Sequence, residues 1–398
     1  MFERLEPVIP DPILGLMAAY RADPDPRKVD LGVGVYRDQH GQTPILAAVR
    51  QAESALLADQ TTKTYVSSSG NAEFNRAMEV LTLGTAHPAL TAGRVRSIQT
   101  PGGCGALRLG AELIRAVMPH AVVHVSTPTW ANHVPLLSGS GLKLEHYPYY
   151  DPASGGVQFD AMLQALDRLP PRAVVLLHAS CHNPTGADLS HAQWRELLPL
   201  VRRRQLLPFI DMAYLGLGDG ADADAFGLRL FCAELPEVLF AVSCSKNFGL
   251  YRERTGSLHL VSESTAAADA SFTHMVRIAR GIWSMPPDHG AAIVQAVLGD
   301  IALTQQWTEE LDAMRWRIQG LRHDVLQQLQ EQCPLRDFSF IATQRGMFSF
   351  LGINTAQVRA LREHHHVYMT DDSRMNIAGL RAENLGYFVR AVAQVLAG

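Results

Sequence analysis

The chain has 398 residues, of which 47% are apolar and 19% are charged, and its formal net charge is −4. This length indicates two domains in one compact unit. The small net charge, with no long run of one sign, argues against nucleic-acid binding and against a membrane-surface role.

The five cysteines are scattered and odd in number, and they form no C-x-x-C pair. This pattern predicts a reducing compartment and no disulfide framework. The first twelve residues carry acids and prolines but no apolar core, so we expect no signal peptide. No apolar run approaches the roughly 18 residues that a membrane helix needs. We therefore expect a cytoplasmic protein.

In chain order, short apolar runs predict strands that alternate with helical patterns. Asp160 is predicted to cap a helix over Ala161–Leu169, and Ser190 with Gln193 forms a capping box that opens a helix reaching Arg204. A long helical pattern covers Trp307–Gln330. The predicted strands are Val122–Val125, Val174–Leu177, Leu206–Ile210, Val238–Val242 and Leu258–Leu260. This alternation favours a mostly parallel sheet covered by helices, which binds ligands at the carboxyl ends of its strands.

Lys246 follows the run Val238–Val242 and stands among small hydroxyl residues. A lysine delivered by a strand to a polar cavity can hold an aldehyde as a Schiff base. Taken alone, such a lysine is more often a solvated loop residue. The polar motifs elsewhere in the chain change this interpretation.

Several motifs occur in one order and spacing along nearly the whole chain. The chain resembles the fold-type I pyridoxal-phosphate aminotransferases, and more narrowly their aspartate and aromatic amino acid group. The resemblance runs from about Asp11 to Gly379. Its motifs are Leu31–Tyr36, Thr61–Tyr65, Thr100–Gly103, His182–Gly186 and the Lys246 segment.

The resemblance implies an α/β fold with a large domain, built on a mostly parallel seven-stranded sheet between helices, and a smaller α/β domain from both termini. Residues 1–45 are expected to join the small domain, 46–310 to form the large cofactor-binding domain, and 311–398 to form the small C-terminal domain.

The resemblance also implies catalytic roles. Lys246 is expected to anchor pyridoxal 5'-phosphate and to act as the base, and Asp211 to keep the cofactor's ring nitrogen protonated. Asn183 and Tyr214 match residues that hydrogen-bond the ring hydroxyl, and Trp130 matches the aromatic residue that stacks on the ring. His133 and His178 match positions that orient Asp211.

The phosphate needs backbone donors and a cation, and Gly102–Gly105 followed by the helical pattern Ala106–Val117 is a glycine-rich helix start. By resemblance, the phosphate ligands are Gly103, Cys104, Ser243, Ser245 and Arg254, with Tyr65 supplied by a neighbouring subunit. The family has a hydroxyl residue where this chain has Cys104, so we expect a weaker grip on the phosphate.

Arg374 matches the arginine that binds the substrate α-carboxylate. Gly34 matches the position where the backbone closes over the substrate, which only glycine leaves room for. Arg280 matches the arginine that pairs with a distal carboxylate across the subunit interface, so we expect a homodimer with shared sites. Ile282 and Met285 stand where aspartate-specific members carry asparagine. Trp130 and Asn183 complete the expected substrate contacts.

We therefore expect an aminotransferase that moves the amino group of tyrosine, phenylalanine or tryptophan, and of aspartate or glutamate, to 2-oxoglutarate by a ping-pong mechanism. Aspartate aminotransferase is the nearest alternative, and the apolar Ile282 and Met285 are then neutral changes. Two further alternatives are less favoured. A pyridoxal-phosphate lyase would have little use for Arg280, and a cofactor-sensing transcription regulator would need an added DNA-binding domain of roughly 60 residues.

His364, His365 and His366 are consecutive, so they do not share one face of a helix or strand. We expect a surface role for them and no metal site.

Overall fold

A computed structural model describes residues 2–6 and 12–397. Asp11, where the resemblance begins, and part of the expected N-terminal segment lie outside the described residues. The chain divides into two units, one of residues 1–43, 317–343 and 347–398 (the small unit) and one of residues 44–316 and 344–346 (the large unit).

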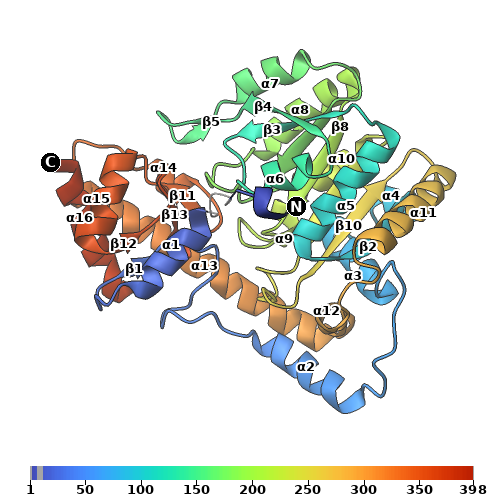
Figure 1. The fold of residues 1–398 in the computed structure, drawn as a ribbon, viewed down its shortest axis with the longest axis horizontal. Coiled ribbons are helices and arrows are strands. Elements are labelled where there is room, and N and C mark those ends of the chain that lie inside the picture. Colours follow the sequence, from blue (N-terminus) through green and yellow to red (C-terminus); the bar gives the residue numbers. More distant parts are fainter. Residues whose placement is uncertain (1, 7–11, 398) are drawn as a thin grey trace. The chain divides into compact units, whose positions relative to one another are not determined.

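The large unit is built on a seven-stranded sheet with the order β2-β10-β9-β8-β7-β3-β4 (Figure 1). β10 is antiparallel to both neighbours, whereas the remaining pairs are parallel. The expected mostly parallel α/β sheet is thereby confirmed. The strands are β2 (Val95–Pro101), β3 (Val122–Thr127), β4 (Lys143–Pro148), β7 (Val174–His178), β8 (Leu207–Met212), β9 (Val238–Ser243) and β10 (Thr255–Val261).

The central strands β8 and β9 are almost entirely buried because helices cover both faces of a parallel sheet. α5 (Gly102–Val117) packs on β2, β9 and β10, and it also contacts α11 (Thr265–Ile282). β5 (Tyr150–Asp151) and β6 (Gly156–Val157) form a separate short ladder. The other helices of this unit are α2 (Ala47–Asp59), α3 (Ala72–Leu83), α4 (Pro88–Thr91), α6 (His133–Ser138), α7 (Phe159–Asp167), α8 (His191–Arg204), α9 (Ala221–Asp224), α10 (Phe226–Glu234) and α12 (His289–Gly299).

The two predicted capping signals had different outcomes. The Ser190 capping box opens α8 as predicted, since its hydroxyl accepts from Gln193 N and the Gln193 side chain returns the bond. The prediction that Asp160 caps a helix is wrong. α7 begins at Phe159, so Asp160 lies in its first turn. Burial of the Phe159 ring, which is 9% exposed, favours the earlier start.

The small unit combines short strands with helices. β1 (Val29–Asp30) pairs in parallel with β12 (Val367–Tyr368), and β11 (Phe348–Phe350) pairs antiparallel with β13 (Arg374–Asn376). Arg322 is 1% exposed and donates to Ile341 O, Phe348 O and Ser349 Oγ. The other elements are η1 (Phe2–Arg4), α1 (Pro12–Ala22), α14 (Phe340–Thr343), α15 (Thr355–His365), η2 (Ile377–Gly379) and α16 (Ala382–Ala397).

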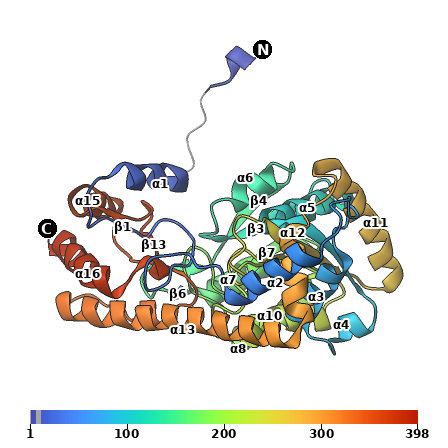
Figure 2. The same ribbon diagram turned by 90° about the horizontal axis from the view of Figure 1, so that it is seen from below.

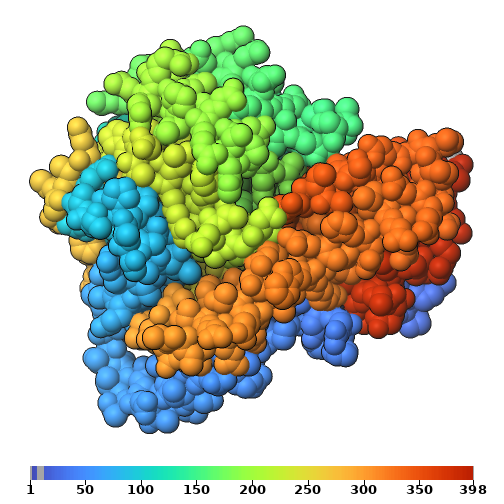
Figure 3. Space-filling model, turned by 180° about the vertical axis from the view of Figure 1, so that it is seen from behind, coloured from blue at the N-terminus to red at the C-terminus, as the bar shows by residue number. Residues whose placement is uncertain are grey.

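α13 (Ile301–Gln332) is a single helix that contributes to both units (Figure 2). It is longer than the predicted Trp307–Gln330 pattern and stays exposed along much of its length (Figure 3). Among the described helices, none is long and apolar enough to cross a membrane.

Candidate active site

Lys246 lies in the turn that follows β9, and its side chain is half-buried. Its Nζ is 4.7 Å from the centre of the Tyr214 ring. In the described part of the chain, Nζ makes no hydrogen bond and no ion pair within 4 Å of a carboxylate oxygen. Burial lowers the pKa of the Lys246 ammonium and Arg254 lowers it further, while the charge of Asp211 opposes this shift. The amine is therefore predisposed to act as a nucleophile or base.

Asp211 lies inside β8, where it pairs with His178 of β7 and Ala241 of β9. Its carboxylate is buried, and Oδ2 accepts a hydrogen bond from His133 Nε2 at 3.0 Å. Burial by itself would raise the pKa of Asp211, but the hydrogen bond and charge of His133 and the charge of Lys246 bring it below its ordinary value. Asp211 is consequently a buried anion, available to pair with a cationic ring nitrogen.

A row of imidazoles supports Asp211. Thr129 Oγ1 lies 2.8 Å from His133 Nδ1 and 3.4 Å from His178 Nε2. His133 therefore faces the Asp211 carboxylate with Nε2 and the Thr129 hydroxyl with Nδ1. Burial lowers the pKa of His178 to about 3, helped by the charge of His133. His133 thus hydrogen-bonds the Asp211 carboxylate, and His178 lies opposite Asp211 on the neighbouring strand.

His182 continues this row, and the sequence analysis gave it no role. Its ring lies 4.1 Å from His178 and stacks on Tyr149 at 4.2 Å. Asp188 accepts from the backbone N–H groups of Cys181 and His182 and so holds the turn that carries Asn183. The motif His182–Gly186 could be recognised in the sequence, but the hydrogen bonds from its backbone to Asp188 could not.

Asn183 and Tyr214 are buried side by side, and Asn183 Nδ2 donates to the Tyr214 hydroxyl at 3.4 Å. Asn183 follows β7 and Tyr214 follows β8. Both therefore come from the carboxyl ends of adjacent parallel strands, the edge where such sheets bind ligands. This pair can hydrogen-bond one oxygen atom of a bound ring.

The start of α5 forms a cradle for an anion. Gly102 has φ +70°, and a Cβ there would come within 2.6 Å of Arg254 Nη2. A Cβ on Gly103 would come within 3.1 Å of Ser243 Cβ. The first N–H groups of this 16-residue helix have no partner within the helix, so they are donors for an anion.

Other side chains lie near the start of α5 or near Asp211. Arg254 Nη1 lies 3.4 Å from Ser245 Oγ. Cys104 is half-buried, and its Sγ lies 3.7 Å from Asn132 Nδ2, a neighbour that the sequence analysis did not single out. Trp130 is half-buried and meets the His133 ring edge-on at 5.2 Å.

The large-unit residues match the polar parts of pyridoxal phosphate one by one. An amine suits its aldehyde, a buried carboxylate its ring nitrogen, and the Asn183 and Tyr214 pair its ring oxygen. The cradle with Arg254 suits its phosphate. The residues present therefore fit this cofactor.

Two of the predicted residues belong to the small unit. Arg374 Nη2 donates to Gly32 O at 2.8 Å, and its guanidinium lies 4.6 Å from the centre of the Phe348 ring. A Cβ on Gly34 would come within 2.9 Å of the same ring, which explains the glycine. The structure thus brings Arg374 and the glycine-containing segment 31–36 together.

Tyr65 and Arg280 are not gathered with Lys246 in the chain. Tyr65 is 89% exposed, and Arg280, near the end of α11, is exposed and donates to Ser284 Oγ. Tyr65 and Arg280 belong to one surface region, because their segments are in contact. Val66, the residue after Tyr65, donates its backbone N–H at 3.0 Å to Sδ of Met285, which follows Arg280 in the chain.

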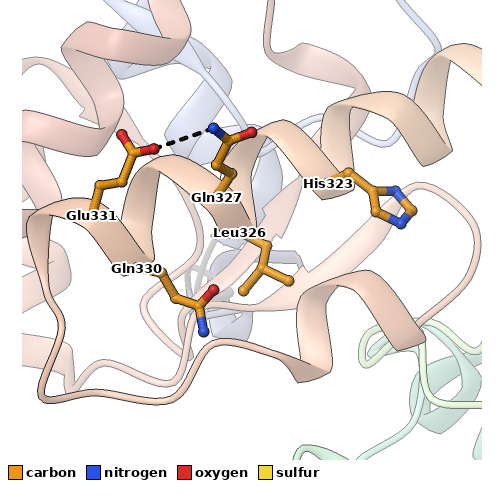
Figure 4. Close-up of a pocket in the computed structure, with 5 residues that line it drawn as sticks. All are labelled: His323, Leu326, Gln327, Gln330 and Glu331. Atoms are coloured by element: carbon orange, nitrogen blue, oxygen red, sulfur yellow. Dashed lines mark hydrogen bonds between the residues drawn. The ribbon is translucent and has the colours of Figure 1, made fainter.

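Two other features involve none of the predicted site residues. A shallow hollow of about 500 Å³ on α13 is lined by His323, Leu326, Gln327, Gln330 and Glu331, none of which is a predicted site residue (Figure 4). His366 lies 2.7 Å from Asp23 Oδ2 and 3.2 Å from Asp25 Oδ2. Within residues 2–6 and 12–397, no cluster of three His, Cys, Asp or Glu side chains could hold a metal ion.

Residues 26–392 match the family model "Aminotransferase class I and II". The chain is 48% identical to an aromatic-amino-acid aminotransferase of Pseudomonas aeruginosa, over 100% of this chain and 99% of that one. It is 42% identical to an aspartate aminotransferase of Escherichia coli, with full coverage of both chains. It also resembles the crystal structure of an aromatic-amino-acid aminotransferase from Burkholderia pseudomallei covalently bound to pyridoxal phosphate, with 43% identity, a TM-score of 0.97, and coverage of 100% and 99%.

Proposed function

The chain belongs to the class I and II aminotransferases, and from this premise we propose that it is a pyridoxal-phosphate-dependent aminotransferase of aromatic amino acids. It moves the amino group to 2-oxoglutarate in a ping-pong reaction and also accepts aspartate or glutamate. The observation that carries the proposal is the Lys246 amine, placed against the Tyr214 ring and close enough to Asp211 for their charges to interact.

When bound, pyridoxal phosphate accepts the electron pair released as the Cα–H bond of the amino acid breaks. Lys246 would hold the cofactor covalently until the amino group of the substrate takes its place, and its freed amine would then take the proton from Cα and deliver it to the cofactor. Asp211 stays ionised because of His133 and keeps the ring nitrogen protonated. Asn183 and Tyr214 bind the ring oxygen.

The phosphate is bound by the start of α5 at Gly103 and Cys104, by the hydroxyls of Ser243 and Ser245, and by Arg254. Trp130 stacks on the cofactor ring. Position 104, where the resemblance implies a hydroxyl residue, carries a thiol, which is a weak donor. Arg254 and the backbone N–H groups consequently supply most of the binding.

Arg374 binds the α-carboxylate, and the backbone at Gly34 lies over the substrate. Arg280 pairs with the distal carboxylate of dicarboxylic substrates. Ile282, which is 47% exposed, and Met285 make the surroundings of Arg280 apolar. This favours a pocket that also accepts a ring. The relative named as an aspartate aminotransferase, at 42% identity, makes aspartate the main alternative substrate.

We assign Tyr65 and Arg280 to the active site of a second copy of the chain. Their exposure in one surface region supports this assignment, because residues that complete a partner's site must be accessible in the free subunit. The protein is accordingly a homodimer in this proposal. Residues 46–310 form the cofactor-binding domain and 1–45 with 311–398 the small domain. The five free cysteines support a cytoplasmic location.

The first test compares kcat/KM for phenylalanine, tyrosine and aspartate with 2-oxoglutarate as acceptor. The proposal predicts turnover of all three and parallel lines in double-reciprocal plots. Turnover of aspartate alone would favour the aspartate enzyme. No turnover of any amino acid would overturn the proposal.

The second test removes Arg280. A dicarboxylate in the Arg280→Leu variant leaves one charge unpaired, at a cost on the order of 3–5 kcal/mol. We expect kcat/KM for aspartate to fall strongly while that for phenylalanine is retained. Arg277→Leu, one turn earlier on the exposed face of α11, is the matched control and should leave both values unchanged. Equal losses for both substrates would contradict this role of Arg280.

Mixing Arg280→Leu with Lys246→Ala subunits tests the shared site. If Arg280 crosses the interface, each heterodimer has one site with both defects and one with neither, so aspartate activity recovers in part. No recovery, despite demonstrated subunit exchange, would place Arg280 outside the partner's site.

A further inference from the structure

Asn376, in β13, fastens the segment 31–35 by three hydrogen bonds. Its backbone N–H donates to Leu31 O at 2.7 Å, and its Nδ2 donates to Val33 O at 2.7 Å and Val35 O at 2.8 Å. Its Oδ1 accepts from Ala378 N at 3.0 Å. The side chain is buried, and both its polar atoms are engaged. The side-chain amide thus holds two carbonyls, and the backbone N–H a third, of a segment more than 340 residues away.

Arg374, two residues earlier in β13, contacts the same segment. Its Nη2 donates to Gly32 O, the carbonyl between those held at Leu31 and Val33. Gly32 N in turn donates to Asp30 Oδ1 at 3.1 Å. The position of Gly32 O therefore depends on the bonds on either side of it. Asn376 makes the bond at Leu31 with its backbone N–H and the bond at Val33 with its side-chain amide, so it helps to place Gly32 O, one acceptor of the Arg374 guanidinium.

We propose that Asn376 is a positioning residue for substrate carboxylates: it holds the segment 31–35 on β13, so that Gly32 O fixes the guanidinium of Arg374. This inference rests on the proposed function, which gives Arg374 the α-carboxylate. A long arginine side chain loses rotamer freedom when it binds a ligand, and an arginine held in place beforehand loses less. Its planar fork must also face the carboxylate correctly to make two bonds.

Asn376→Asp is the most specific variant. It keeps the shape and the oxygen that accepts from Ala378 N, but it replaces the donating NH₂ by an oxygen that faces two carbonyls. Asn376→Ser is a second, neutral variant that keeps an acceptor for the same N–H and loses the long donor. Asn354→Asp is the matched control, because Asn354 is an exposed N-cap in the same unit and gains the same charge.

The probe is 3-indolepropionate, which has an aromatic ring and a carboxylate but no amino group to react. Its dissociation constant is measured by calorimetry on the cofactor-loaded protein, alongside KM and kcat for phenylalanine. With two hydrogen bonds lost, we expect the dissociation constant and KM to rise about tenfold or more in both Asn376 variants. The cofactor should remain covalently attached, and kcat should stay within about threefold of the wild-type value. Asn354→Asp should match the wild type in all of these measurements.

Unchanged KM and probe affinity in either Asn376 variant with a wild-type melting profile would overturn the inference. A fall in kcat alone, or loss of the cofactor with unchanged probe affinity, would overturn it as well, because either would place the effect away from the carboxylate. If the wild type fails to transfer amino groups, the proposed function falls, and probe binding still decides the role of Asn376.

Discussion

Cys104→Ser should strengthen the binding of pyridoxal phosphate. Position 104 lies in the first turn of α5, where backbone N–H groups, Arg254 and Ser245 form the anion cradle. The half-buried thiol contacts Asn132 Nδ2 at 3.7 Å, and burial raises the pKa of Cys104 above its ordinary value. The group is therefore an uncharged S–H near neutral pH, and S–H is a weak donor.

A serine hydroxyl at this position adds one good donor without changing the charge. A net hydrogen bond contributes about 1 kcal/mol, which corresponds to about a fivefold lower dissociation constant. The assay titrates cofactor-free protein with pyridoxal phosphate and measures the dissociation constant by equilibrium dialysis. Cys333→Ser, in the small unit, is the control for the exchange itself and should leave the dissociation constant unchanged.

An unchanged or higher dissociation constant in Cys104→Ser, with a wild-type melting temperature, would refute the reasoning. It would mean that the side chain at position 104 does not face the phosphate. Because the thiol pKa is raised, the cofactor affinity of the wild type should also show no loss from thiolate formation as the pH rises toward 9.0, the ordinary value.

Lys246→Ala should cut turnover by several orders of magnitude, and borohydride should fix the cofactor to the Lys246 peptide in the wild type alone; a labelled peptide without Lys246 would contradict the assignment. Asp211→Asn should retain cofactor but lose most turnover, and near-normal kcat would reduce Asp211 to a structural residue. His259, whose ring nitrogens lie 2.7 Å from the hydroxyls of Ser97 and Ser257, has a pKa lowered to about 3 by burial. Its stabilising contribution is present above the ordinary value of 6.5 and is lost as the pH falls toward 3, so His259→Gln should flatten the decline of melting temperature in that window; an unchanged slope would contradict this.

The sequence by itself determined those features that depend on neighbouring residues. The Ser190 capping box needs only a hydroxyl and an amide three residues apart, so it could be recognised directly. The apolar runs before Asp211 and Lys246 predicted β8 and β9, because strands buried on both faces contain few polar residues. The motifs around Lys246 indicated the family and the cofactor.

Only the tertiary structure showed which atoms of distant residues meet. The bond from His133 to Asp211 joins residues 78 positions apart, and the bonds from Asn376 to Val33 and Val35 span more than 340. The hydrophobic periodicity of the sequence does not predict such pairs, because they form only when distant strands and turns pack together. Burial of Phe159 likewise overrode the local capping signal of Asp160. Local spacing fixes a turn or a helix start, whereas the pKa of Asp211 and the hold on Arg374 depend on packing between distant segments.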